Sequence, residues 1–241
     1  MKTILLLPLI IFSLYSFAQT EEKTNNVKKH RIGLNIGAAT ANGDFSSTDA
    51  SNENSGFAEA GFTFNISYQY NFDKNFSATF LYGSAAYTFD AQSYVEELAN
   101  ITPTVNWRVE AESYGIGYTM FGLKAFSDGN TKAYINPMIG VGAMITPQVD
   151  INASNGINSI DQRIRESDAV LALVFGISGG IDITASDMIS INIDVTYLNS
   201  NFEVEQELES FDMNGNPIVV RETSDFPYGS ILLSAGVGFN F

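Results

Sequence analysis

One stretch of the sequence alternates strictly between large apolar and small polar side chains, and this pattern constrains the fold more than any other feature. Between residues 62 and 72 the chain reads FTFNISYQYNF, so that aromatic residues and isoleucine share one parity while threonine, asparagine, serine and glutamine share the other. Successive side chains of a β-strand point to opposite faces, so this period of two predicts a strand with one greasy and one polar face.

The same period recurs along the chain. It is present over residues 30–41, 132–146, 171–183, 189–197 and 231–241, and in noisier form over 76–89 and 110–126, which predicts eight strands. The connections alternate in length, with short turns at 73–75, 127–130 and 185–187 and long polar loops near 42–58, 90–108, 147–168 and 203–227. Short turns at one end and long loops at the other are typical of an outer-membrane barrel.

The choice between a soluble and a membrane barrel depends on which face of the strands, inner or outer, carries the large apolar side chains. A soluble carrier such as a lipocalin points its large apolar side chains inward around a ligand. Here the face opposite the aromatic one is mostly Gly, Ser, Thr and Asn, which fit a narrow interior, so the greasy face needs lipid. Closure is also required, because an open sheet edge in hydrocarbon leaves backbone groups unpaired. The predicted fold is all-β: an eight-stranded antiparallel up-and-down transmembrane β-barrel.

The N-terminus predicts export. Lys2 precedes an apolar run over residues 4–12 and a small-x-small site at 16–18, which indicates a signal peptide over 1–18. We then expect a short periplasmic segment over 19–29 and the barrel over 30–241. The absence of cysteine excludes disulfides and a lipid-anchored lipoprotein. With an even strand number, both termini of this integral outer-membrane protein are expected in the periplasm.

The chemistry-bearing residues are few. The formal net charge of −15 disfavours nucleic acid as a partner, because phosphates require a basic face. The single histidine, His30, is expected at the periplasmic end in a basic interfacial cluster with Lys28, Lys29 and Arg31, far from outer-leaflet lipid. Serine–histidine chemistry therefore lacks its base and cysteine chemistry its nucleophile. We expect no enzymatic activity, no catalytic residues and no cofactor.

Charged residues of the long loops have two interpretations each. Glu203, Glu205, Glu207 and Glu209 continue the parity of the lipid-facing residues before them, so we expect that strand to project beyond the membrane. They form either a solvated strand extension or a cation- or partner-binding edge. No calcium-loop motif is present, and we expect no metal site. The loop arginines are either solvated or in contact with lipopolysaccharide phosphate: Arg163 and Arg165, with Arg108 and Arg221.

The interior is expected to be polar and nearly filled. By parity, the polar residues expected to face it include two acids and no clear arginine: Asn65, Gln69, Asn136, Asp182, Asn192 and Asp194. These side chains form either a hydrogen-bonded plug or a narrow cation-leaning path. A route for small apolar solutes would need an apolar interior. The candidates for such a lining are Met138, Met144, Leu198 and Leu232. Aromatics near the long loops are expected to form an interfacial girdle: Tyr87, Phe89, Trp107, Tyr197, Phe202 and Tyr228.

The end of the chain carries a family resemblance. The sequence SAGVGFNF, with Phe239 and the terminal Phe241, resembles the C-terminal signal by which barrel-assembly machinery recognises outer-membrane proteins. The segment YINPMIGVG at 134–142 is similar to a strand common in small outer-membrane β-barrels, the superfamily of the OmpX, OmpA-barrel, OmpW and PorT-like types. These motifs mark a fold and not an activity.

The resemblance implies outer-membrane lipid, lipopolysaccharide and the barrel-assembly machinery as partners, with an envelope protein as a further one. The function we expect is non-enzymatic: a structural, surface-binding or complex-subunit role carried by the extracellular loops. A narrow passive channel for small solutes, OmpW-like, is the alternative. A component of a secretion or assembly machine, PorT-like, is the third.

Overall fold

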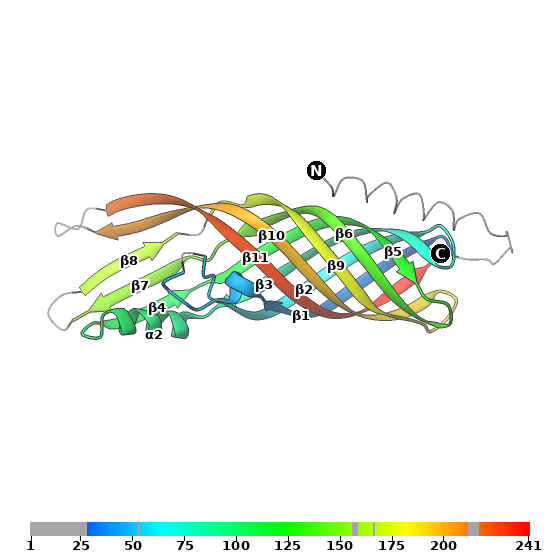
Figure 1. The fold of residues 1–241 in the computed structure, drawn as a ribbon, viewed down its shortest axis with the longest axis horizontal. Helices are drawn as coiled ribbons and strands as arrows, with labels where there is room; N and C mark the ends of the chain where they lie inside the picture. Colours follow the sequence, from blue (N-terminus) through cyan, green and yellow to red (C-terminus); the bar gives the residue numbers. More distant parts are fainter. Residues whose placement is uncertain (1–27, 53, 156–158, 166, 212–216) are drawn as a thin grey trace, which may run out of the picture.

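The computed structural model describes residues 28–52, 54–155, 159–165, 167–211 and 217–241. The predicted signal peptide, 1–18, and most of the segment 19–29 lie outside the described residues. Within them, eight antiparallel strands close into a ring (Figure 1), because the last strand pairs with both its predecessor and the first strand. The ring consists of β1 (His30–Ala41), β2 (Ala58–Asn71), β3 (Phe76–Phe89), β5 (Ser113–Phe126), β6 (Thr131–Ile145), β9 (Val170–Thr184), β10 (Ile189–Phe211) and β11 (Pro217–Asn240). The predicted eight-stranded barrel is confirmed.

The two faces of the ring strands follow the alternation of the sequence. On β2, Phe62 is 56% exposed on the outside of the barrel, whereas its neighbour Thr63 is fully buried inside. On β9, Phe175 is 54% exposed and Ser178 is buried. The greasy face therefore surrounds the ring, as expected of a surface in contact with lipid.

Three tight turns lie at the end of the barrel that holds His30 and Phe241, which we call the terminal end. Two of them are joined by an ion pair, in which Lys74 Nζ lies 2.9 Å from Asp128 Oδ1. The hydrogen bond from Lys74 lowers the pKa of Asp128 below its ordinary value. The predicted short turns at 73–75, 127–130 and 185–187 are confirmed.

The opposite end, the loop end, is more structured than predicted. The expected loops at 42–58, 90–108 and 147–168 contain η1 (Gly43–Ser46), α2 (Ala91–Ile101), β4 (Asn106–Ala111), β7 (Val149–Ser154) and β8 (Ser159–Ile164). The expected strand 110–126 is divided at Glu112, because Glu110 and Ala111 pair with β7 instead of the ring. The prediction of a loop over 203–227 is wrong as well, because β10 continues to Phe211 and β11 begins at Pro217. The two strands therefore continue past the ring, and that they project beyond the membrane stays a prediction.

These added strands continue the sheet away from the ring in the order β10-β8-β7-β4. We call this part the extension: β4, β7, β8 and residues 203–211 and 217–226 of β10 and β11. In Figure 1 it stands at the left, with α2 beside β4. The N-terminus of α2 is capped by Asp90, whose side chain accepts a hydrogen bond of 2.9 Å from Ser93 N. Among the described residues, no helix has the length and apolar character to cross a bilayer.

Candidate functional site

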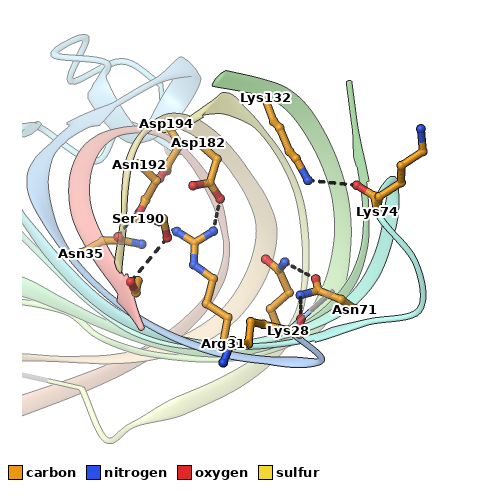
Figure 2. Close-up of polar contacts among 12 residues, drawn as sticks. Lys28, Arg31, Asn35, Asn71, Lys74, Lys132, Asp182, Ser190, Asn192 and Asp194 are labelled. Carbon is orange, nitrogen blue, oxygen red and sulfur yellow. Dashed lines mark hydrogen bonds and ion pairs between the residues drawn. The ribbon is translucent and has the colours of Figure 1, made fainter. Parts of the chain in front are cut away.

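The polar half of the barrel interior lies toward the terminal end and is organised around Arg31 of β1. Its guanidinium forms an ion pair with Asp182 of β9, and its Nη2 lies 3.4 Å from Asn192 Oδ1 of β10 (Figure 2). Both charged side chains are 8% exposed. The guanidinium fits because Gly238 has no side chain, and a Cβ there would collide with it.

This position corrects the sequence analysis, which placed Arg31 in an interfacial cluster and expected no clear interior arginine. Arg31 shares the parity of Gly33 and Asn35, the inward-facing residues of β1, and therefore points into the lumen. His30 lies outside, with its Nδ1 2.7 Å from the Tyr68 hydroxyl and its ring stacked on Phe241.

A chain of amides continues the network across the lumen. Asn192 Nδ2 donates to Asn35 Oδ1 at 2.8 Å and to Asp194 Oδ2 at 3.1 Å. Asn35 Nδ2 in turn donates to Asn65 Oδ1 at 2.8 Å, and Ser234 Oγ donates to Asp194 Oδ1 at 2.9 Å. The network links β1, β2, β10 and β11, so it fixes the positions of four ring strands relative to one another.

All six polar residues named from the sequence face the interior, and each is at most 7% exposed: Asn65, Gln69, Asn136, Asp182, Asn192 and Asp194. Asn136 Oδ1 accepts a hydrogen bond from Thr79 Oγ1 at 3.1 Å, and Gln69 Nε2 donates to Asn71 Oδ1 at 2.6 Å. The structure therefore brings five of them into one neighbourhood around the same small cavity, with Asp182 joined through Arg31.

That cavity measures about 50 Å³ and is lined on one side by Lys124, whose Nζ lies 3.5 Å from the centroid of the Tyr134 ring. Sequence reasoning missed Lys124, although it shares the inward parity of Met120. A buried water needs at least about 10–15 Å³, so the space suits a few waters. It is too small for a continuous solute path.

The half of the interior toward the loop end is aromatic and apolar. Phe45 of η1 is fully buried among the rings of Tyr87, Tyr114 and Tyr228, with centroid distances of 5.0, 5.1 and 5.2 Å. The Tyr87 hydroxyl lies 2.9 Å from that of Tyr228. We call this cluster the plug, because its side chains fill the cross-section of the barrel: Phe45, Tyr87, Tyr114, Tyr118, Met120, Met144, Leu198, Phe202, Phe226 and Tyr228.

The plug corrects the predicted girdle. Tyr87, Phe202 and Tyr228 were assigned to the lipid interface, but they are at most 1% exposed and point inward. The four apolar candidates for a solute route, Met138, Met144, Leu198 and Leu232, also face inward and are buried. Because these side chains pack closely, the apolar part of the interior is filled and leaves no open route.

The charged residues of the extension pair with one another. Arg165 Nη2 lies 2.9 Å from a carboxylate oxygen of Glu209, and Arg221 Nη2 lies 2.6 Å from Glu207. Longer pairs of 3.8 and 3.9 Å join Arg165 to Glu207 and Arg221 to Glu205. Glu203 lies on the same outward face, opposite Asp225 of β11. In the described part of the chain, no cluster of His, Asp and Glu has metal-binding geometry.

Two further loop arginines also have carboxylate partners. Arg163 Nε lies 2.5 Å from Asp150 Oδ1 across the β7–β8 pair, and Arg108 Nη2 lies 2.5 Å from Glu110. The hydrogen bond from Arg163 lowers the pKa of Asp150, and the same bond raises the pKa of Arg163. At the other end of the barrel, Phe239 and Phe241 are 47% and 55% exposed on its outer surface.

Comparison with known proteins gives a family match over nearly the whole chain. The family model described as outer membrane protein beta-barrel domain matches residues 4–241. No curated protein sequence matches the chain significantly.

Several solved structures resemble the fold at low identity. A major outer membrane protein of Thermus thermophilus is 12% identical with a TM-score of 0.50, and the alignment covers 88% of this chain and 99% of that one. Neisserial surface protein A is 12% identical with a TM-score of 0.48, covering 88% and 97%. The attachment invasion locus protein Ail of Yersinia pestis is 12% identical with a TM-score of 0.42, covering 88% and 99%.

Proposed function

Because this chain belongs to the outer membrane protein β-barrel domain family and is integral to the outer membrane, we propose that it is a closed, non-enzymatic barrel whose extension carries its function. The role is structural, surface-binding or that of a subunit in an envelope complex. In this arrangement the terminal end faces the periplasm and the extension stands at the cell surface, as long connections do in barrels of this kind.

The observation that carries the proposal is the filled interior beneath a built extension. Phe45 closes the loop end against Tyr87, Tyr114 and Tyr228, and the Arg31–Asp182 network fills the other half. A strand crosses the hydrocarbon in about 9–11 residues. Since β10 has 23 residues and β11 has 24, about half of each is available outside the bilayer.

An acyl-transfer or lipase role receives no support from the arrangement. His30 is the one histidine of the sequence and lies at the terminal end, where its ring is occupied by Tyr68 and Phe241. Lipopolysaccharide as a partner is less favoured than a protein, because the loop arginines Arg163, Arg165 and Arg221 already face carboxylates. Assembly would still use the C-terminal residues Phe239 and Phe241, as the family resemblance implies.

The test is single-channel conductance of the purified mature protein in planar lipid bilayers. We expect no steady opening from the natural protein, and brief openings from a variant with Phe45→Ala and Tyr228→Ala, which loosens the plug. A matched variant on the lipid-facing side, Phe175→Ala, should stay closed. Steady conductance of the natural protein would overturn the proposal in favour of a channel.

A further inference from the structure

The extension and the rim of the barrel border a second cavity, next to the plug, with a volume of about 150 Å³. It lies at the loop end, where the segment before β2, the end of β3, α2, β7, β8 and the long β10–β11 hairpin converge. Five aromatic rings line it: Phe57, Phe89, Tyr94, Tyr114 and Phe226.

The rings contact one another, edge-to-face around Tyr94 and tilted elsewhere. The centroid of Tyr94 lies 5.0 Å from that of Phe57 at an interplanar angle of 88°, and 5.6 Å from that of Phe89. Tyr114 and Phe226, which belong to the plug, form the opposite wall with centroids 5.8 Å apart. Aromatic rings held in this way form a stiff wall that loses little conformational entropy when a ligand binds.

One wall residue has an unfavourable backbone. Phe57 has a φ of +49°, a left-handed conformation that is an outlier for a bulky side chain. Its backbone is held by hydrogen bonds of 2.7 Å from Asp90 N to its carbonyl oxygen and 3.0 Å from its own N to Ser47 O. Such strain persists where the surrounding structure imposes it, and it clusters at functional sites. Here it holds the ring of Phe57 against the cavity.

The polar groups of the lining define the chemistry of a ligand. Tyr94, Gln206 and Ser224 have no side-chain hydrogen bond to any described residue, whereas the Tyr114 hydroxyl donates to Gly56 O at 2.6 Å. Burial raises the pKa of Tyr94, so its hydroxyl stays protonated as a donor. The described residues that line the cavity carry no charged side chain. The lining thus offers hydrogen bonds and aromatic surface to a neutral group.

We propose that this cavity is a binding site for a small neutral molecule with one aromatic ring, or an alkyl segment of equal size, and one hydrogen-bonding group. A cavity of about 150 Å³ is large enough for a benzene-sized ligand. The inference rests on the proposed surface-binding function and names the class of ligand. The hydroxyl or carbonyl of such a molecule would meet Tyr94, Gln206 and Ser224, and its apolar part the five rings.

The experiment is ¹⁹F NMR titration of 4-fluorobenzyl alcohol into the mature protein in lipid nanodiscs, with empty nanodiscs as the partition control. We expect saturable broadening of the fluorine signal with the natural protein. Val149→Phe, at a lining position that is 4% exposed, should weaken binding at least about ten-fold by filling the cavity. The matched change Val219→Phe, at an extension position that is 46% exposed and outside the cavity, should leave binding unchanged.

Folding of each variant is checked by its heat-modifiable gel mobility, and Ser224→Phe provides a second filled-cavity variant from another strand. The proposal is overturned if the filled variants bind the probe like the natural protein, or if the natural protein matches empty nanodiscs. Tighter binding of the trimethylammonium analogue would overturn the assignment to a neutral ligand. If the natural protein does not bind the probe but its barrel is closed to ions, the ligand proposal fails and the proposed function stands. The failure of one proposal is therefore distinguishable from the failure of the other.

Discussion

The ion pair between Arg31 and Asp182 in the lumen is the charged contact on which stability should depend most. Removing one partner leaves the other buried and uncompensated, which typically costs about 3–5 kcal/mol. We therefore expect Arg31→Leu to destabilise the barrel by about that amount in urea titrations in phospholipid vesicles. The double variant Arg31→Leu, Asp182→Leu should lose markedly less, because neither member of the pair is then left without its partner. Equal costs for the single and double variants would show that packing, not charge, dominates this site.

The sequence contains the signal for Arg31 but not for Phe45. Arg31 has the inward parity of Gly33 and Asn35, so alternation alone places it in the lumen, despite its neighbours Lys28, Lys29 and His30. Phe45 lies in a 3₁₀ turn between strands, where no period exists. Its burial among Tyr87 and Tyr228 depends on contacts between residues more than 40 positions apart, which local patterns do not encode.

Among the elements of the extension, the β7–β8 hairpin gives a prediction about pH. The hydrogen bond from Arg163 lowers the folded-state pKa of Asp150 below its unfolded value, so the pair stabilises the hairpin at neutral pH. That stabilisation is lost as the pH falls through the folded-state pKa, below the ordinary aspartate value of about 3.9. Both side chains are nearly half exposed, so the effect is small.

Hydrogen exchange of the hairpin amides measures this effect. At pH 7 we expect Asp150→Asn to speed exchange in β7 and β8 by up to about five-fold. As the pH is lowered toward 2, the difference between the natural protein and the variant should shrink, because protonation of the folded carboxylate removes the charge that Arg163 contacts. Asp187→Asn, in a turn at the terminal end, is the control and should change nothing. An equal effect of Asp150→Asn at both pH values would contradict a role for its charge.

Ring strands were predictable and the extension strands were not, for a physical reason. A ring strand such as β2 has lipid on one side and the lumen on the other, so its sequence must alternate. The strands β4, β7 and β8 have six residues each and lie outside the ring, where no lumen imposes this alternation. They form because β10 extends past the ring and offers Leu208–Ser210 to β8 as a pairing edge.

At the scale of the whole molecule, the ring and the extension share two long strands, and Phe226 of the extension also belongs to the plug. The ring is closed by its own pairings, whereas β4, β7 and β8 join the rest of the sheet, among the described residues, through the pairing of β8 with β10. A closed barrel needs no further edge partner. The ring is therefore expected to fold without the extension, but the extension is not expected to persist without the hairpin.

Replacing residues 206–222 with an Asn-Gly turn tests this division, because Glu205 and Thr223 are paired and a two-residue turn joins such partners. We expect the shortened protein to keep its heat-modifiable mobility, while amides of β4, β7 and β8 exchange at least about ten-fold faster. The control is the full-length Val219→Phe protein, since it retains the hairpin. Failure of the shortened ring to fold would show that the extension is part of the folding unit, and unchanged protection of β7 and β8 would show that α2 and the barrel rim hold them without β10.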